Sequence, residues 1–293
     1  MHFENLKEKC EYFRNLTDYK LTPNSYVIAM LDGRSFSKLI KNKYEKPFDE
    51  KFVRIMNEVA EYLVKNIQGA KFAYTQSDEI SILITDFDTP ETDAAFGYRI
   101  CKLQSILASM AASKFNQLAF LYDVQPRLYE NCLSDCEDTI YETNDVLEML
   151  KKQKLAEFDC KVWSVPDYNT AFCHFLWRQN DCIRNSKQQT AQTYLSHKEL
   201  EGKSADEQIE LCKAEKNVDW NTLDAGLKYG RLIYKERKLF KNLVVDTETA
   251  GLDGVPVQMM QEQEYIRNVW CSHSADLFGD ELSVIKTLIP QRP

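Results

Sequence analysis

The chain has 293 residues, of which 44% are hydrophobic and 12% aromatic, and its formal net charge is −8. This composition supports a sizeable core and excludes wholesale disorder. No apolar run approaches the ~20 residues that cross a bilayer, and the charged first fifteen residues do not resemble a signal peptide. We therefore expect a cytoplasmic protein with no membrane partner.

The first clear element in chain order is a strand from Tyr26 to Leu31, an apolar run that is typical of a buried central strand and ends at Asp32-Gly33-Arg34. A helix follows from about Asp49, a plausible N-cap residue, and Gly69 ends it. Its apolar residues recur at three- and four-residue steps, which predicts one buried helical face. They are Phe52, Ile55, Met56, Val59, Leu63 and Ile67.

A hairpin is predicted from Phe72 to Thr85, and its corner holds Gln76-Ser77-Asp78-Glu79. Such a corner usually takes Gly, Asn, Pro or a single Asp, so two adjacent acids there call for an explanation. A second long helix is expected from about Ala94 to Leu118. The stretch from 122 to 157 is irregular, with a short helix near 145–154, and a strand follows at 158–165.

The order strand, helix, strand, strand, helix, strand predicts an α+β fold of the ferredoxin-like (βαββαβ) type, which is also the core of polymerase palm domains. In that topology the first and third strands are central neighbours. The end of the first strand and the corner of the hairpin then lie at the same edge of the sheet. We therefore expect Asp32 and Asp78 to come together.

Two ionised carboxylates ~4 Å apart repel each other by ~4 kcal/mol at an effective dielectric near 20. The protein can offset this cost if they share a proton, pair with a base or bind a divalent cation. Oxygen ligands without a nearby His or thiolate favour Mg²⁺ over zinc. Two Mg²⁺ ions ~3.5–4 Å apart would serve phosphoryl or nucleotidyl transfer. Gly33 would let a backbone carbonyl approach such an ion.

Cations and hydrogen-bond donors should then line a triphosphate. Arg99 and Lys102 share a helical face, Lys46 precedes Pro47, and Ser77 lies in the acidic corner. Taken singly, each of the three cations is equally typical of a solvated surface. Basic residues also gather in 178–198 and in 229–241, where they indicate either RNA contacts or solvated faces.

The nine cysteines are an odd number, which favours reduced thiols over a disulfide framework. Cys271 and His273 are separated by one residue, and Cys132 and Cys136 by three. No second pair stands at zinc-finger spacing. We therefore interpret the cysteines as ordinary thiols.

Several motifs in succession resemble those of tRNA-histidine guanylyltransferases and their relatives, the guanylyltransferase-like 3′–5′ RNA polymerases. The similarity spans roughly Leu6 to Lys238. The motifs are L31-D-G-R-S-F36, K46-P-F-D49, Q76-S-D-E-I-S81, F96-G-Y-R-I-C-K102, F158-D-C-K161 and W177-R-Q-N-D181.

The resemblance implies a palm-like nucleotidyltransferase domain over residues 1–243, with an insertion at about 122–157, and a C-terminal extension over 244–293. It implies two Mg²⁺ ions, with metal ligands at Asp32, the carbonyl of Gly33 and Asp78, and with Glu79 as the adjoining catalytic acid. Phosphate contacts fall on Lys46, Ser77, Arg99 and Lys102. The candidate RNA contacts are Arg178, Arg184, Asn185, Lys187, His197 and Lys198.

The chemistry that the resemblance implies has two steps. ATP first activates the 5′-monophosphate of a tRNA, and the 3′-hydroxyl of an incoming nucleotide, GTP in the histidine case, then attacks the activated end. The partners implied are tRNA, nucleoside triphosphates and three further copies of the chain in a homotetramer.

The chain also departs from the histidine-specific pattern. Those enzymes carry a His-Ile-Asn-Asn stretch where this chain has 182–186, an Arg where it has Met30, and an Arg where it has Lys161. These differences favour the guanylyltransferase-like branch, which restores missing 5′ nucleotides by pairing with the opposite acceptor strand.

Two other functions fit the same element order. A nucleotide cyclase uses the same palm and a similar metal pair but needs no RNA surface. An RNA-recognition module has the same βαββαβ order but stacks bases on exposed aromatic residues of its sheet, whereas the strands here are mainly aliphatic.

Overall fold

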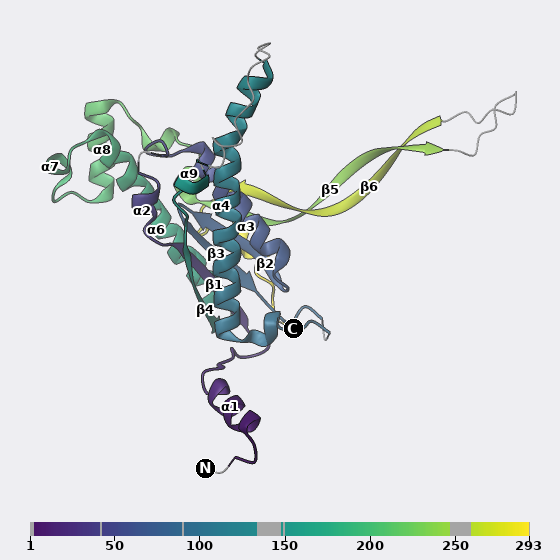
Figure 1. Ribbon diagram of the computed structural model, residues 1–293. Coiled ribbons are helices and arrows are strands. Elements are labelled where there is room, and N and C mark those ends of the chain that lie inside the picture. The colour runs from purple at the N-terminus through teal and green to yellow at the C-terminus, as the bar shows by residue number, and fades with distance from the viewer. Residues whose placement is uncertain are drawn as a thin grey trace, which may run out of the picture.

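The computed structural model describes residues 3–41, 43–89, 91–133, 148, 150–246 and 259–292. Figure 1 shows a central sheet with helices packed against it and a long two-stranded hairpin that extends away from the body. Residues 134–147 and 149, which belong to the insertion predicted at 122–157 and include part of the short helix predicted at 145–154, lie outside the described residues.

The centre of the fold is an antiparallel sheet, six-stranded within the described residues, in the order β4-β1-β3-β2-β5-β6. Leu31 in the first strand lies opposite Ile80 in the third, and Asp32 lies opposite Asp159 in the fourth. The predicted ferredoxin-like order, with the first and third strands as neighbours, is confirmed. The strands are β1 (Tyr26–Gly33), β2 (Ala70–Gln76), β3 (Glu79–Ile84), β4 (Phe158–Val165), β5 (Arg231–Asp246) and β6 (Met259–Ser274).

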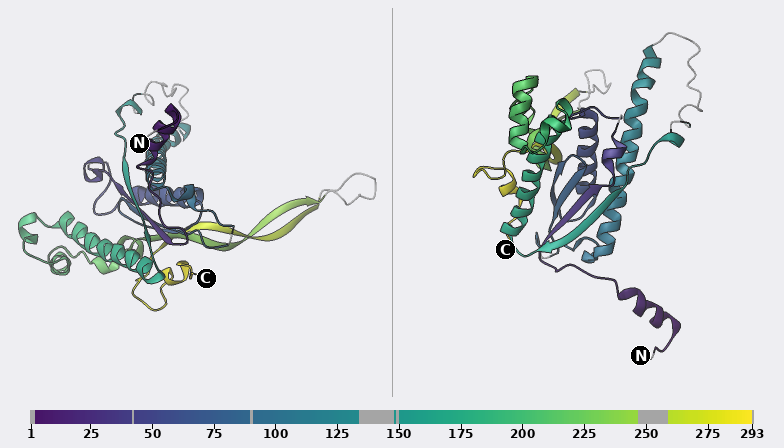
Figure 2. Two further views of the ribbon diagram at one scale, coloured as in Figure 1. Left: turned by 90° about the horizontal axis from the view of Figure 1, so that it is seen from below. Right: turned by 90° about the vertical axis from the view of Figure 1, so that its left-hand side faces the viewer.

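One face of the sheet packs on α3 and α4, and the other packs on α6 and the C-terminal segment, as Figure 2 shows edge-on. The helices are α1 (Leu6–Asn15), α2 (Phe36–Leu39), α3 (Glu50–Asn66), α4 (Ile100–Leu133), α6 (Tyr168–Tyr194), α7 (His197–Leu200), α8 (Ala205–Lys216), α9 (Ala225–Tyr229) and α10 (Ile285–Leu288), with 3₁₀ turns η1 (Ala95–Tyr98) and η2 (Trp220–Thr222). Within the described part of the chain, no helix has both the length and the apolar character that crossing a bilayer requires.

Local sequence explains where the two helices of the first face begin. The side chain of Asp49 accepts a hydrogen bond from the backbone N–H of Phe52 at 2.8 Å, which caps α3 as predicted. Helix α4 begins at Ile100 rather than near Ala94, because Phe96 and Gly97 have φ values of +52° and +60°. A regular α-helix cannot pass through such left-handed residues.

The hairpin of β5 and β6 continues the sheet across the predicted boundary between residues 243 and 244. Strand β5 pairs with β2 only over Arg231–Tyr234, whereas it pairs with β6 along its whole length. After β6 the chain returns to the body, where Phe278 and Ile285 join the apolar cluster under α6. The C-terminal extension is therefore part of the sheet and of its second core.

Candidate active site

Asp32 and Asp78 lie at the same corner of the sheet. Asp32 is near the end of β1, and Asp78 is in the two-residue turn that joins β2 to β3. Side chains alternate between the two faces of the sheet along a strand. Ile28, four residues before Asp32, and Leu83, four residues after Glu79, both pack on the face that α6 covers. Asp32 and Glu79 therefore lie on that face as well. The convergence predicted from the topology is thus present.

The environment of this corner opposes negative charge. Burial, reinforced by the charges of Asp32 and Glu79, raises the pKa of Asp78 to about 6, although a hydrogen bond from Ser77 Oγ to Asp78 Oδ1 (3.0 Å) acts in the other direction. The pKa of Asp32 is raised as well, by burial first and then by the charge of Asp159. A cation bound at this corner would therefore offset the cost of ionising Asp32 and Asp78.

Asp159 is an acid that the sequence did not single out. It lies directly opposite Asp32 in the β1–β4 pairing, so both side chains point to the same face. Lys161, two residues further along β4 on that face, partly offsets the charge of Asp32. The signal was the F158-D-C-K161 motif, which places an acid on the strand next to the one that carries Asp32.

Glu79 is held by an ion pair rather than left free. Its Oε2 accepts hydrogen bonds from the Arg178 guanidinium and from Gln76 Nε2 (3.0 Å). Burial raises the pKa of Glu79, and the positive charge of Arg178 counteracts this rise. Arg178 also donates to Asp181 Oδ2 at 2.9 Å. This network fixes the last pair of the hairpin against α6.

The prediction that Arg178 contacts RNA is corrected by its position. Its side chain is 6% exposed and lies between the carboxylates of Glu79 and Asp181, on the side of α6 that faces the sheet. The neighbouring Trp177 is exposed, and the guanidinium lies 4.5 Å from the centre of its ring. Sequence periodicity could not distinguish the buried arginine from an exposed one, because both readings give a polar residue on an amphipathic helix.

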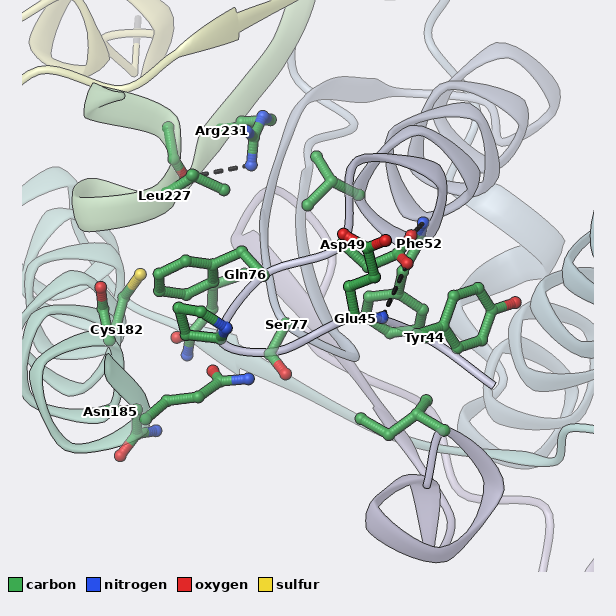
Figure 3. Close-up of a pocket in the computed structure, with 17 residues that line it drawn as sticks. Tyr44, Glu45, Asp49, Phe52, Gln76, Ser77, Cys182, Asn185, Leu227 and Arg231 are labelled. Carbon is green, nitrogen blue, oxygen red and sulfur yellow. Dashed lines mark hydrogen bonds between the residues drawn. The ribbon is translucent and has the colours of Figure 1, made fainter. Parts of the chain in front are cut away.

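A cavity of about 80 Å³ lies beside the acidic corner, between the loop before α3 and helix α6. Figure 3 shows Gln76 and Ser77 at its centre, Tyr44 and Phe52 on one side, and Asn185 on the other. The exposed Lys46 lies between Glu45 and Pro47, which both line the cavity. The structure thus places Ser77 and Asn185 around one opening, and Lys46 is adjacent in sequence to two of its lining residues.

Arg99 and Lys102 lie at the opposite end of the sheet from Asp32. Arg99 forms a bridge with Lys20 and an ion pair with Asp18 (2.7 Å), before the chain enters β1. From Tyr26 to Asp32 the strand spans about 20 Å at its usual rise. Within one chain, the predicted phosphate contact of these two residues at the acidic corner is therefore wrong.

The remaining predicted RNA contacts lie along α6 and α7. Arg184 is exposed and pairs with Asp181, while Asn185 Nδ2 donates to Asp181 Oδ2 at 3.3 Å. Lys187 pairs with Asp206 and lies 4.9 Å from the ring centre of Trp220. On α7, His197 and Lys198 are exposed. These cations form no contact with the acidic corner, and their role in binding RNA stays a prediction.

Comparison with known proteins identifies the family. The model of the family described as "tRNAHis guanylyltransferase" (Thg1) matches residues 7–166, more than half of the chain. The chain belongs to the tRNAHis guanylyltransferase family. The predicted membership and the prediction of a nucleotidyltransferase that acts on tRNA are thereby confirmed.

Several known proteins are similar to the chain over most of its length. An uncharacterised mimivirus protein is 28% identical over 80% of this chain and 78% of its own. A probable tRNA(His) guanylyltransferase of Drosophila melanogaster is 25% identical over 78% of this chain and 73% of its own. A solved bacterial Thg1-like protein in complex with ATP has a TM-score of 0.73 and 26% identity, over 98% of this chain and 99% of that one.

Replacing the buried Arg178 by Gln should destabilise the protein by about 3 kcal/mol or more, because the charge of Glu79 would remain without its partner. Urea unfolding measures this change. Arg184→Gln is the matched control, since Arg184 pairs with the same Asp181 but is 61% exposed, and its effect should stay within about 0.5 kcal/mol. Equal effects of the two variants would contradict the burial of Arg178.

Replacing Asp78 by Asn should stabilise the protein in metal-free buffer at pH 7.5. The pKa of Asp78 is about 6 in the folded protein against an ordinary value of 3.8 for an aspartate, so its ionisation costs stability as pH rises from about 4 to 6, and the cost persists above pH 6. The gain from Asn should be about 1–3 kcal/mol at pH 7.5 and should vanish near pH 4. Thermal melts with chelator at both pH values test this, with the exposed Asp280→Asn as control. A gain at pH 4 equal to that at pH 7.5 would refute the electrostatic cause.

Proposed function

We propose that this protein is a Mg²⁺-dependent enzyme that adds nucleotides to the 5′ end of tRNA in the 3′–5′ direction, after ATP activates the 5′-monophosphate. The observation that supports this proposal is the convergence of Asp32 from β1 and Asp78 from the β2–β3 turn at a corner where burial, followed by the charges of neighbouring acids, raises the pKa of both. Such a corner gains stability when a divalent cation binds.

The donor set fits Mg²⁺. Around Asp32 and Asp78 the available groups are carboxylate oxygens and the backbone carbonyl of Gly33, which are the hard ligands that Mg²⁺ prefers. A side chain at Gly33 would collide with the ring of Phe36 at 2.3 Å, so glycine keeps the chain compact here. When bound, two Mg²⁺ ions would favour ionisation of the attacking hydroxyl and stabilise the leaving pyrophosphate.

The protein's own groups prepare this corner. Above about pH 6, Asp78 is ionised and can serve as a ligand. Arg178 holds Glu79 away from solvent, so Glu79 acts as a positioning residue for the hairpin corner. His174, whose pKa burial lowers to about 4, is neutral at physiological pH and contacts Ser81 Oγ at 3.1 Å. The imidazole therefore adds no charge that would compete with a metal.

The cavity beside Ser77 is the site that we propose for the nucleotide. Its wall combines the aromatic rings of Tyr44, Phe48 and Phe52 with the polar groups of Gln76 and Asn185, a mixture suited to a base and its polar edge. Lys46 is exposed and lies between two lining residues in the chain, and we propose that its ammonium group neutralises part of the triphosphate. A solved structural neighbour of this chain binds ATP, and this supports the assignment.

For Arg99 and Lys102 we propose a different geometry. Since they lie at the far end of the sheet from Asp32, they can contact a triphosphate at this corner only from another copy of the chain. This agrees with the homotetramer that the family resemblance implies. Light scattering at assay concentration tests it, and a monomer with full activity would eliminate any role for these two residues in the corner.

Asp32→Ala and Asp78→Ala should each reduce nucleotide addition to background, because each removes a carboxylate ligand from the proposed metal pair. The assay uses tRNA with a 5′-monophosphate, ATP, all four nucleoside triphosphates and Mg²⁺, and it detects extension at the 5′ end. Asp280→Ala, an exposed acid far along the chain, should retain wild-type activity. Near wild-type activity in a folded Asp32 or Asp78 variant would disprove the metal assignment.

The nucleotide that the protein adds should be chosen by the opposite strand of the acceptor stem. The stretch 182–186 lacks the Asn-rich pattern of histidine-specific enzymes, so we expect Watson–Crick pairing, rather than protein contacts, to select the base. A tRNA that lacks its first nucleotide is prepared with each of four facing bases, and incorporation of each nucleotide is measured. Addition of G whatever the facing base, restricted to histidine tRNA, would refute template-directed repair.

A further inference from the structure

A second group of potential metal ligands lies on the hairpin, away from the acidic corner. Glu236 of β5 and Cys271 and His273 of β6 each offer one ligand atom, and these three atoms all lie within 4.8 Å of one another. All three residues are half-buried. Cys271 and His273 are close in sequence, whereas Glu236 is 35 positions from Cys271 in the chain and comes close only through the pairing of the strands.

The pairing of the two strands explains how these side chains meet. Tyr234 lies opposite Cys271, Leu232 opposite His273, and Glu236 opposite Val269. Opposed residues and those two positions away share one face of a sheet, so the three ligands lie on the same face. Glu236 and His273 reach toward each other along that face, which is possible because a two-stranded ribbon is strongly twisted, as Figure 1 shows.

The imidazole of His273 has one ring nitrogen that makes no hydrogen bond within the described residues. Its Nε2 is buried and makes no hydrogen bond, although it lies 3.1 Å from Glu236 Oε1. The ring packs against Tyr234, with 4.9 Å between ring centres and 30° between planes. The buried nitrogen is therefore held in place and directed at the carboxylate without a hydrogen bond between them. Two ligands of one metal ion have this relation.

We propose that Glu236, Cys271 and His273 bind one Zn²⁺ ion. Zinc in proteins takes thiolate, imidazole and carboxylate ligands at about 2.0–2.3 Å, so tetrahedral ligand atoms lie about 3.3–3.8 Å apart. The present separations, up to 4.8 Å, need only small side-chain rotations to reach these values. The mixed S, N and O donors select zinc over Mg²⁺, and a water molecule would complete the four ligands.

The charges around the three ligands suit a divalent cation. The carboxylate of Glu236 and the Cys271 thiolate together carry two negative charges, which Zn²⁺ would neutralise. Lys238, two residues beyond Glu236 on the same face, interacts with Cys271, and this interaction raises the pKa of Lys238.

The position of the site indicates a structural role. Strand β5 pairs with the body of the sheet up to Tyr234, and Glu236 follows two residues later. Beyond this point, within the described residues, β5 pairs only with β6. Two-stranded ribbons are marginally stable by themselves. A zinc ion that joins the two strands here would fix the root of the hairpin.

The first test is metal content and ligand identity in the full-length protein. After gel filtration with a weak chelator, elemental analysis should find about one Zn²⁺ per chain. Replacement by Co²⁺ should give a thiolate-to-metal charge-transfer band. Cys271→Ser should lose the band, and Cys271→Ser and His273→Asn should each lose more than about 100-fold in affinity, since even outer-shell changes cost 10–100-fold.

The matched control is Cys173→Ser, which removes an exposed cysteine of α6 and should keep the band and the zinc. Glu236→Gln preserves the shape of the strand and should shift the Co²⁺ spectrum while leaving the fold intact in chelator, as circular dichroism can verify. A wild-type protein without the charge-transfer band, or a band that survives Cys271→Ser, would overturn the proposal.

Hydrogen exchange tests the structural role separately. Zn²⁺ should slow amide exchange in 235–241 of β5 and in 264–272 of β6 in the wild type, and it should have no effect in His273→Asn. Exchange rates that do not respond to Zn²⁺ in a wild type that binds it would overturn the role at the root of the hairpin. None of these measurements depends on nucleotide addition, so they stand apart from the proposed enzymatic function.

Discussion

The crowding of carboxylates on one face of a buried sheet edge is the constraint that organises this molecule. Asp32 near the end of β1 meets Asp78 and Glu79 from the corner between β2 and β3, and Asp159 adds a fourth acid opposite Asp32. Repulsion of this kind costs several kcal/mol in a partly buried site. The protein compensates one of the four charges with the buried Arg178 and leaves Asp32 and Asp78 without a direct ion pair among the described residues, which is the state that a metal site requires.

Helix α6 connects this electrostatic arrangement to the hairpin. One residue after Arg178, Gln179 donates a hydrogen bond to the carbonyl of Asp276 (2.7 Å) and accepts one from the N–H of Phe278 (2.7 Å). These bonds anchor the segment that follows β6. On the same side, Gly230 has a φ of +82°, and a side chain there would meet the ring of Tyr74 at 2.4 Å. The start of β5 therefore packs closely against the core. Arg178 and Gln179 are adjacent residues of one motif, and the first binds Glu79 at the acidic corner while the second anchors the segment after the hairpin.

The features that depend on strand order could be predicted from the sequence. The predictions were wrong where the position of a residue depends on the direction of its side chain or on the end of the sheet at which a helix begins. The βαββαβ order and the meeting of Asp32 with Asp78 follow from apolar runs and from topology alone. The burial of Arg178 depends on which side of α6 faces the sheet, a choice that a polar residue does not reveal. The position of Arg99 could have been predicted from the topology. Strand β3 begins at the acidic corner and runs away from it, so the helix after β3 must begin at the opposite end of the sheet.

Two thiols lie near the acidic corner, and both have a raised pKa. Cys160 is next to Asp159 on β4 but points to the opposite face, where it packs against the cluster under α4. Burial, and secondly the charge of Asp159, raises its pKa to about 12. Cys182, which lines the cavity beside Ser77, has a pKa raised by burial to about 11. Both remain protonated near neutral pH, and a protonated thiol is not a metal ligand. Among the described residues around Asp32 and Asp78, the groups available to bind a metal are therefore oxygen donors, whereas the Cys271 thiol lies beside Glu236 and His273 on the hairpin. Burial of the thiols at one site and partial exposure of Cys271 at the other would favour a hard cation at the sheet corner and a softer one at the hairpin, as we propose.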